Sequence, residues 1–349
     1  MPPVSLDRRT FMRVASLAAL GVAAGCSSDE PTTGATITPT ASGSSATPTT
    51  PSRPLAWRQL ASGGGPKARD HHTFTANADG SLVFLFGGKT KGRVFNDAWA
   101  YERSTRLWQP LPVGPPARFG HSAAFVDGHL VVFGGQNGGT FYNDTWVFDP
   151  VHGKWQRLTP GRAPAARYGA SGTTIANSMV ISHGFASGRF NDTWALTRRW
   201  ANVSPAGSAP RPFKRCLHRT VYLPGRTKMV LFGGQTDGTP YLGDTWTYDP
   251  TAKRWTEVKG AGPSPRTLYA AAATTNTMYL FGGLGRGGAL NDVWSFDGAT
   301  WTKRQVSGTP PRRRGALEGA VVSGPSMLVF GGSTGPGDLA DLWELSLPG

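Results

Sequence analysis

The stretch FGGQNGGTFYNDTWVFDP, from Phe133 to Pro150, decides the fold of this chain. It consists of an apolar run that ends in two glycines, a glycine-rich loop, and an Asn-Asp pair that opens an aromatic segment. Such a stretch fits a phosphate or metal site, which would occur once, or a structural unit, which would recur at a fixed period. The number of copies distinguishes these two interpretations.

Both halves of the stretch recur along the chain. The apolar run with its glycine pair ends at Gly88, Gly135, Gly234, Gly283 and Gly332, and a degraded copy, ISHG, ends at Gly184. The second half, NDTW or a close variant, recurs with tryptophans 47 to 52 residues apart, at Trp99, Trp146, Trp194, Trp246, Trp294 and Trp343. The chain therefore contains six copies of one supersecondary unit, and the stretch is structural.

Each unit contains four segments with the composition of β-strands. In the second unit they are residues 118–126, 129–135, 144–150 and 154–158, which are rich in β-branched and aromatic residues and separated by turn signals. Four short antiparallel strands repeated about every 49 residues are typical of a propeller blade. The sequence predicts an all-β, six-bladed β-propeller. In it, the glycine pair ends the second strand with φ > 0, and the tryptophans of the third and fourth strands pack between blades.

Closure of the ring is also predicted. Five fourth strands follow the units and carry Trp108, Trp155, Trp200, Trp255 and Trp301, which leaves the sixth unit without one. The segment LAWRQL, residues 55–60, matches LWQPL and KWQRL and precedes the first unit. We expect this segment to be the fourth strand of the last blade and to close the ring.

Residues 55–349 resemble the kelch-repeat family. The second unit has the kelch pattern of Arg-x-x-His in RFGH, a double glycine in FGG, then NDTWVFD and KW. The third unit departs most, because Ala170 replaces the His and His183 replaces the first glycine of the pair. The resemblance implies a kelch propeller, but kelch propellers serve many functions, so it does not define an activity.

The N-terminal residues 1–26 have the features of an export signal. Arg8, Arg9 and Phe11 lie where the twin-arginine export motif places them, and an apolar run of 11 residues follows. As a helix this run would be only about 16 Å long, too short for a membrane core of about 30 Å. The run ends in AAGC, which resembles a bacterial lipobox with Cys26 as the lipid-accepting residue; cleavage by an ordinary signal peptidase is the alternative.

Residues 27–54 are dominated by Ser, Thr and Pro and have almost nothing apolar to bury. Such a segment stays extended, and as a flexible coil it spans roughly 30 Å. It fits a disordered linker that lifts the domain off a membrane. We therefore expect a protein on the outer face of the cytoplasmic membrane, or a secreted one if Cys26 carries no lipid.

The amino-acid composition limits the kinds of molecule that this protein is expected to bind. The formal net charge is +15, and the only cysteine besides Cys26 is Cys216, so a structural disulfide is not expected. A large positive charge favours acidic partners. Nucleic acid is disfavoured because of the predicted export, and because the aromatics recur at blade-packing positions and are not interleaved with cations. We expect a monomer that binds a protein or an anionic polysaccharide.

One face of the propeller collects arginines from the starts of the first strands. These candidate ligand-binding residues are Arg69, Arg118, Arg167, Arg215, Arg266 and Arg313. Guanidinium groups around the mouth of a central channel would suit a carboxylate or a phosphate. The third strands begin on the same face with Asp97, Asp144, Asp192, Asp244, Asp292 and Asp341. Structural pairing of the arginines with these aspartates is the competing interpretation.

No cofactor or metal site is expected. His72, His121 and His218 recur three residues after the arginines, as packing or hydrogen-bonding elements would, and the other histidines lack metal-ligand spacing. Known six-unit secreted kelch proteins include sialic acid mutarotases, so a sugar mutarotase or epimerase is the enzymatic alternative, with Glu318 as its candidate carboxylate. The preferred interpretation is a membrane-tethered, extracytoplasmic, non-catalytic binding module without catalytic residues.

Overall fold

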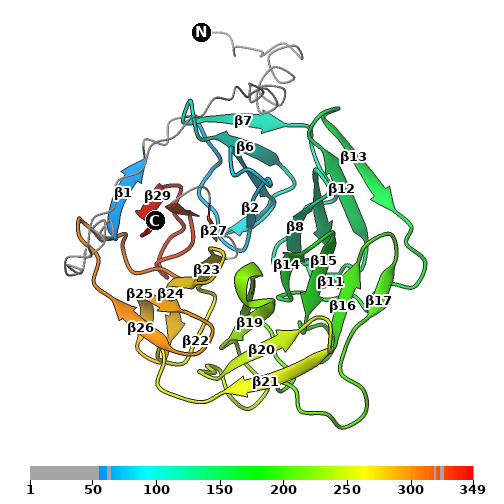
Figure 1. Ribbon diagram of the computed structural model, residues 1–349. Coiled ribbons are helices and arrows are strands. Elements are labelled where there is room, and N and C mark those ends of the chain that lie inside the picture. The colour runs from blue at the N-terminus through cyan, green and yellow to red at the C-terminus, as the bar shows by residue number, and fades with distance from the viewer. Residues whose placement is uncertain (1–54, 61–63, 318–319, 323–325, 349) are drawn as a thin grey trace, which may run out of the picture. The chain divides into compact units, whose positions relative to one another are not determined.

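The computed structural model describes residues 55–60, 64–317, 320–322 and 326–348. These residues form a ring of six β-sheets, which Figure 1 shows face on. This confirms the predicted all-β, six-bladed propeller. The predicted export signal and linker, residues 1–26 and 27–54, lie outside the described residues. Within the described segments, no helix has the length and apolar character needed to cross a membrane.

The first three blades each contain four antiparallel strands, ordered from the centre of the ring to its edge. Blade one consists of β2 (Thr73–Ala76), β3 (Leu82–Phe86), β6 (Ala98–Glu102) and β7 (Leu107–Leu111). Blade two consists of β8 (Ser122–Val126), β9 (His129–Phe133), β12 (Thr145–Asp149) and β13 (Lys154–Leu158). Blade three consists of β14 (Ser171–Ile175), β15 (Ser178–Ser182), β16 (Thr193–Leu196) and β17 (Trp200–Asn202).

The next two blades follow the same plan with small additions. Blade four consists of β18 (Arg219–Leu223), β19 (Lys228–Phe232), β20 (Thr245–Asp249) and β21 (Arg254–Val258), with a 3-10 turn, η1 (Pro224–Arg226), between its first two strands. Blade five consists of β22 (Arg266–Thr267), β23 (Ala270–Ala273), β24 (Met278–Gly285), β25 (Gly288–Phe296) and β26 (Trp301–Arg304). The loops of blades one and two carry two short hairpins, β4 (Lys89–Thr90) with β5 (Arg93–Val94), and β10 (Gln136–Asn137) with β11 (Thr140–Phe141).

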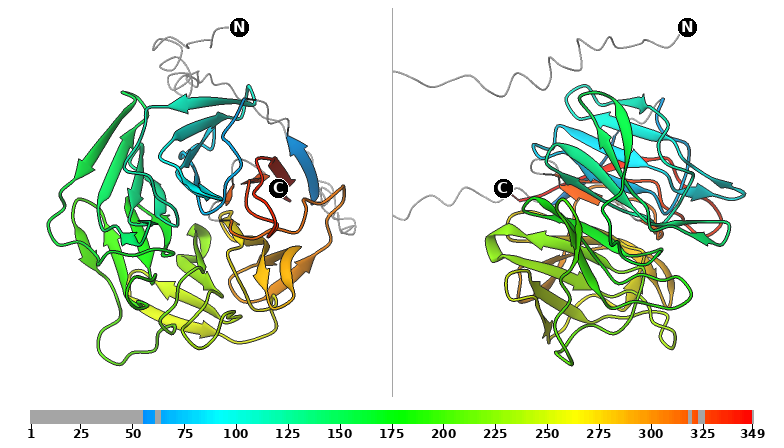
Figure 2. Two further views of the ribbon diagram at one scale, coloured as in Figure 1. Left: turned by 180° about the vertical axis from the view of Figure 1, so that it is seen from behind. Right: turned by 90° about the vertical axis from the view of Figure 1, so that its right-hand side faces the viewer.

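Blade six closes the ring with both ends of the described chain. It consists of β27 (Ala320–Val322), β28 (Ser326–Phe330), β29 (Leu342–Ser346) and, at its outer edge, β1 (Ala56–Leu60). β1 pairs antiparallel with β29, from Ala56 opposite Ser346 to Leu60 opposite Leu342. Figures 1 and 2 show blue β1 beside red β29. The predicted closure by residues 55–60 is confirmed.

The hydrophobic core is divided among the six junctions between neighbouring blades. At the junction of blades one and two, for example, Phe84 and Phe86 pack with Leu130, Val132 and Phe148. Equivalent clusters of buried apolar residues occupy the other five junctions. Because each blade buries apolar side chains on both of its faces, no blade has a complete core of its own, and stability depends on the closed ring.

The tryptophan of each fourth strand packs against the preceding blade. Its ring lies 4.7 to 5.2 Å from the phenylalanine that precedes a glycine pair in the pairs Trp57–Phe281, Trp108–Phe330, Trp155–Phe86, Trp200–Phe133 and Trp301–Phe232. At the junction of blades three and four, Ser182 occupies the phenylalanine position. There the imidazole of His183 lies 6.0 Å from Trp255 and supplies the missing ring.

The glycine pair lets adjacent blades approach closely. Gly134 and Gly135 have φ values of 71° and 91°, as the predicted turn requires. A Cβ on Gly134 would lie 2.8 Å from the carbonyl oxygen of Arg167 in the next blade. The amide of Gly135 donates a hydrogen bond of 2.8 Å to the same oxygen. The pair therefore serves the contact between blades as well as the turn.

Candidate functional site

The six arginine positions at the first-strand starts are fully buried in ion pairs. Arg118 donates from both terminal nitrogens to the two carboxylate oxygens of Asp144, at 2.6 and 2.9 Å, and also to the carbonyl of Gly134. The same fork joins Arg69 to Asp97, Arg167 to Asp192, Arg215 to Asp244, Arg266 to Asp292 and Arg314 to Asp341. Each aspartate accepts a further hydrogen bond from the indole of the third-strand tryptophan, such as Trp146.

The assignment of Arg313 to this set is wrong, because the sixth arginine is Arg314. Arg314 is buried and bonds to Asp341, whereas Arg313 is exposed. In the run RRRG of residues 312–315, composition does not distinguish three successive arginines. The distinguishing feature is the next residue, since Gly315 pairs with Ser333 as Phe119 pairs with Gln136 in blade two.

The ion pairs with aspartate use the same guanidinium groups that would be needed to bind a carboxylate or phosphate ligand. Burial alone raises the pKa of Asp144, but the hydrogen bond and charge of Arg118 outweigh it, so the pKa lies below the ordinary value of 3.8. The other five aspartates have lowered pKa values for the same reasons. The arginines are thus clamps that join the first, second and third strands of a blade, and their guanidinium groups are already used within the protein.

A ring of backbone hydrogen bonds surrounds the axis beside these clamps. The amides of Gly120, Gly169, Leu217 and Leu268 each donate to the equivalent carbonyl of the preceding blade, the amide of Leu317 donates to Leu268, and that of His71 donates to Ala316. The distances are 2.8 to 3.1 Å. The residues at this position have φ values of 52° to 63°, which bulky residues such as Leu217 adopt only when the surrounding structure holds them there. This backbone girdle narrows the channel at the face of the arginine clamps.

Aromatic and aliphatic side chains cover the girdle on that face. The rings of His71, Phe119 and Tyr168 lie 5.6 to 6.0 Å from one another, and Phe141 lies 5.8 Å from Phe185. Leu217, Leu268 and Ala316 continue the cluster around the axis. We call this set of side chains the apolar floor.

Cations surround the apolar floor. The ammonium of Lys89 lies 4.7 Å from the centre of the Phe119 ring, and the guanidinium of Arg189 lies 5.3 Å from that of Phe185. The described loops of this face contain Lys67, Lys89, Lys91, Arg93, Arg162, Arg189, Arg211, Lys214, Lys259, Arg286, Arg312 and Arg313. Apart from the six clamp aspartates, their acidic residues are Asp70, Asp237 and Asp338. Asp237 pairs with Arg189, and Asp338 accepts from Thr90, so this basic face has a strong excess of positive charge.

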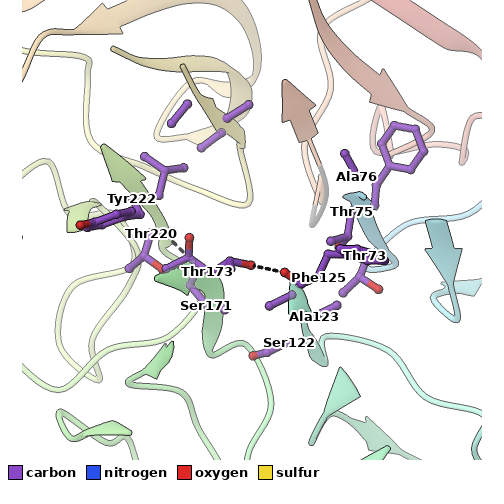
Figure 3. Close-up of a pocket in the computed structure, with 18 of the residues that line it drawn as sticks. Thr73, Thr75, Ala76, Ser122, Ala123, Phe125, Ser171, Thr173, Thr220 and Tyr222 are labelled. Carbon is purple, nitrogen blue, oxygen red and sulfur yellow. Dashed lines mark hydrogen bonds between the residues drawn. The ribbon is translucent and has the colours of Figure 1, made fainter. Parts of the chain in front are cut away.

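The channel opens on the opposite face as a cavity of about 670 Å³. The part of its wall that the structure describes consists of β2, β8, β14, β18 and β23, from blades one to five, and its rim includes Asp127, Ala176 and Pro224 in the turns that follow these strands. Figure 3 shows the serine and threonine side chains that β2, β8, β14 and β18 contribute.

The recurrent histidines lie in the blade junctions. The Nε2 of His121 lies 2.9 Å from the Thr73 hydroxyl, and the His121 ring packs on Phe86. Burial, followed by the charge of Arg69, lowers the pKa of His72 to about 3. Burial likewise lowers the pKa values of His121, His183 and His218 well below 6.5, and nearby arginines add to the effect. These histidines are neutral packing elements.

The described part of the chain contains no group of three or more His, Cys, Asp or Glu residues that could hold a metal ion. Cys216 is buried in the cluster that covers the girdle, and its sulfur accepts a hydrogen bond from the side-chain amide of Gln235. Glu318, the carboxylate named for the mutarotase alternative, lies outside the described residues. Cys26 and the export-signal residues Arg8, Arg9 and Phe11 lie outside them as well.

Two features of this geometry were not predicted from the sequence. The girdle depends on the residue two positions after each clamp arginine, and the only available signal was the glycine at that place in units two and three, Gly120 and Gly169. The apolar floor depends on the residue after the arginine, which is aromatic only in those same two units, as Phe119 and Tyr168. Neither position has the same residue type in all six units.

Three known proteins with similar sequences are longer than this chain. Adagio-like protein 1 of Oryza sativa subsp. japonica is 29% identical over 332 residues, which cover 84% of this chain and 52% of that protein. Host cell factor 2 of Homo sapiens is 28% identical over 66% of this chain and 32% of its own length. The dynein alpha chain of the flagellar outer arm of Chlamydomonas reinhardtii is 30% identical over 44% of this chain and 4% of its own length. The chain thus spans about half or less of these relatives.

A family model described as the KLHDC2/KLHL20/DRC7 Kelch-repeats domain matches residues 50–215 and 196–348. The two matches together cover all six blades of the ring. With the repeated glycine pairs, clamps and junction tryptophans, they show that this chain belongs to the kelch-repeat family.

Proposed function

We propose that this protein is an exported, membrane-tethered kelch module that binds an acidic segment of a partner protein on its basic face, without catalysis. The observation that carries the proposal is the apolar floor surrounded by cations. Aromatic residues at the centre of a surface and charged groups at its rim are typical of protein interfaces. A protein partner also fits the use that kelch propellers generally make of their surfaces.

The cations of the loops, and not the clamp arginines, would supply the attraction. Lys91, Arg93 and Arg286 are exposed near the tips of the loops that follow the glycine pairs. Because these charges are exposed, their contribution should be largest in the rate of association and should weaken as salt increases. An anionic polysaccharide would use the same charges.

Binding of a poly-glutamate peptide and of a polyuronate, measured by biolayer interferometry at low and physiological salt, tests the proposal. The double variant Lys91→Ala/Arg93→Ala should bind the peptide several-fold more weakly, since each lost contact between exposed charges is worth up to about 1 kcal/mol. The matched control is Arg198→Ala/Arg199→Ala, which removes two exposed cations from a turn on the opposite face. Equal losses in both double variants would contradict the proposal, and binding of the polyuronate alone would assign the face to a polysaccharide.

The proposed export and attachment to the membrane are tested separately. We propose that Arg8 and Arg9 direct export and that Cys26 is the acylated residue, on the strength of their positions in the motifs. Two acyl chains would give stable attachment to a membrane, since each buried methylene contributes about 0.8 kcal/mol. Metabolic labelling with a fatty-acid probe should mark the wild type and not Cys26→Ser, and fractionation should find the variant released from the membrane. A wild-type protein that incorporates no probe would support a secreted form.

A further inference from the structure

The cavity on the face opposite the basic face has a two-sided lining. One arc of its wall consists of β2, β8, β14 and β18, which contribute Thr73, Thr75, Ser122, Ser171, Thr173 and Thr220. β23 contributes Ala271, Ala272 and Ala273, which have no polar side-chain atoms. A ligand in this cavity would meet hydroxyl groups, together with some apolar side chains, on the first arc and only methyl groups on β23.

Several of these hydroxyls are already used within the protein. Thr220 donates to the Ser171 hydroxyl at 3.0 Å, and Ser122 donates to the carbonyl of Ala170 at 3.0 Å. By contrast, among the residues that the structure describes, the hydroxyls of Thr75 and Thr173 have no hydrogen-bond partner. Both side chains are only partly buried, and Figure 3 shows them coming from different blades on opposite sides of the opening. They can each donate and accept one hydrogen bond toward a ligand.

Charged groups contribute little to the part of the wall between these hydroxyls. Asp127 is exposed at the rim. Arg219 lies at the bottom, where its guanidinium donates to the carbonyls of Tyr269 and Leu317. The described wall therefore offers hydroxyls and an apolar arc to a ligand, with no carboxylate or ammonium group beside them.

The size and closure of the cavity also suit a small ligand. A volume of about 670 Å³ lies within the range of ligand pockets, roughly 300–1,000 Å³. The backbone girdle narrows the channel at its far end, so a ligand would enter from the rim. At the rim, η1 is fixed by a hydrogen bond from the amide of Gly225 to the carbonyl of Thr275, which joins blades four and five.

We propose that this cavity binds an uncharged saccharide unit. The edge of a sugar ring carries hydroxyls that would bond to Thr75 and Thr173, and its C–H face would lie on the alanines of β23. This site is separate from the basic face, so the proposal does not depend on the function proposed above.

A panel of neutral mono- and disaccharides at millimolar concentration, with matched uronic acids, tests the site by saturation-transfer NMR and calorimetry on the full propeller. At least one neutral sugar should bind, and more tightly than its uronic acid. Thr75→Val and Thr173→Val keep the side-chain shape and remove the hydroxyl, and each should weaken binding about fivefold. Binding only of the uronic acids, or of no sugar in the panel, would overturn the proposal.

Two matched controls test whether the sugar binds in the cavity or elsewhere on the propeller. Thr302→Val removes an exposed hydroxyl on the outer strand β26 and should leave sugar binding unchanged. Lys91→Ala/Arg93→Ala should leave sugar binding unchanged too, although it weakens binding of the acidic peptide. If the Thr75 and Thr173 variants keep the wild-type melting temperature and the wild-type affinity for sugar, the cavity is not the site.

Discussion

Acid should destabilise this propeller well above the pH at which its aspartates are protonated. His72, His121, His183 and His218 are buried in the blade junctions, and burial lowers their pKa values below the ordinary 6.5, to about 3 for His72. Below pH 6.5 the unfolded chain binds protons at these positions and the folded chain does not. Stability is therefore fully present above pH 6.5 and falls as the pH drops below it.

The magnitude can be worked out for His72, whose pKa in the folded state is about 3. Its contribution lowers the free energy of unfolding by about 1.4 kcal/mol for each pH unit below 6.5, so at pH 5 this histidine alone contributes a loss of about 2 kcal/mol. The pKa values of the other three histidines are lowered in the same direction, so their losses add to that of His72 and reduce a stability that is about 5–15 kcal/mol for a typical domain. The clamp aspartates have lowered pKa values, so their contribution is lost only below pH 3.8, outside this range.

Urea unfolding followed by tryptophan fluorescence, at constant ionic strength between pH 7.5 and 5, measures the dependence. His72→Leu should make the slope shallower by about 1.4 kcal/mol per pH unit, and leucine is already the residue at the equivalent position of blade six, Leu317. The matched control is His152→Gln, which changes a mainly exposed histidine outside the blade junctions. A free energy of unfolding that is constant from pH 6.5 to 5, or equal slopes for the two variants, would refute the reasoning.

Three further predictions concern the repeated contacts, each measured by chemical denaturation at pH 7.5. Arg118→Leu should destabilise the protein by about 3–5 kcal/mol, because it leaves the Asp144 carboxylate without its buried partner. The control Arg313→Leu should change stability by less than about 0.5 kcal/mol. Similar effects of the two variants would contradict the assignment of Arg118 as a clamp. Trp57→Ala should lower stability by about 3–5 kcal/mol, because Trp57 of β1 packs on Phe281 at the junction of blades five and six. The control Arg58→Ala should lower stability by less than about 1 kcal/mol. A Trp57→Ala variant as stable as the wild type would refute the role of β1 in closing the ring. Ser182→Phe and His183→Gly should each destabilise the protein alone, but the double variant should be at least as stable as the wild type. If the loss of stability in the double variant equals the sum of the two single losses, the two positions do not compensate for each other.

Most of the fold could be predicted because its determinants repeat. The glycine pair, the Asp-x-Trp of the third strand and the tryptophan of the fourth strand each satisfy a local requirement that recurs six times, so the period, the number of blades and the closing strand follow from position alone. The pairing of clamp arginines with aspartates was one of two open interpretations. Connectivity placed both residue types on one face, but it did not predict that Arg118 and Asp144 meet in a bidentate fork.

The candidate sites were harder to predict because they are built from positions that do not repeat. The apolar floor uses His71, Phe119 and Tyr168, which occupy two different positions of the repeat and come from three of the six units. The cavity depends on which units have hydroxyls and which have alanines in their first strands. A function that depends on the differences between units cannot be inferred from what the units share.

The third unit shows how a departure from the repeat can be compensated in space. By the pattern, Ser182 removes a junction phenylalanine and His183 places a side chain where glycine is required, so the sequence suggests two defects. In the structure the backbone of His183 keeps the left-handed conformation of the glycine it replaces, with φ of 59°, and its carbonyl still accepts from Arg167. Its imidazole lies 5.1 Å from His218 and 6.0 Å from Trp255, where the phenylalanine ring of other junctions packs. Since the two changes restore one contact together, the irregular unit is evidence for preserved packing geometry at this junction and not for a site of chemistry.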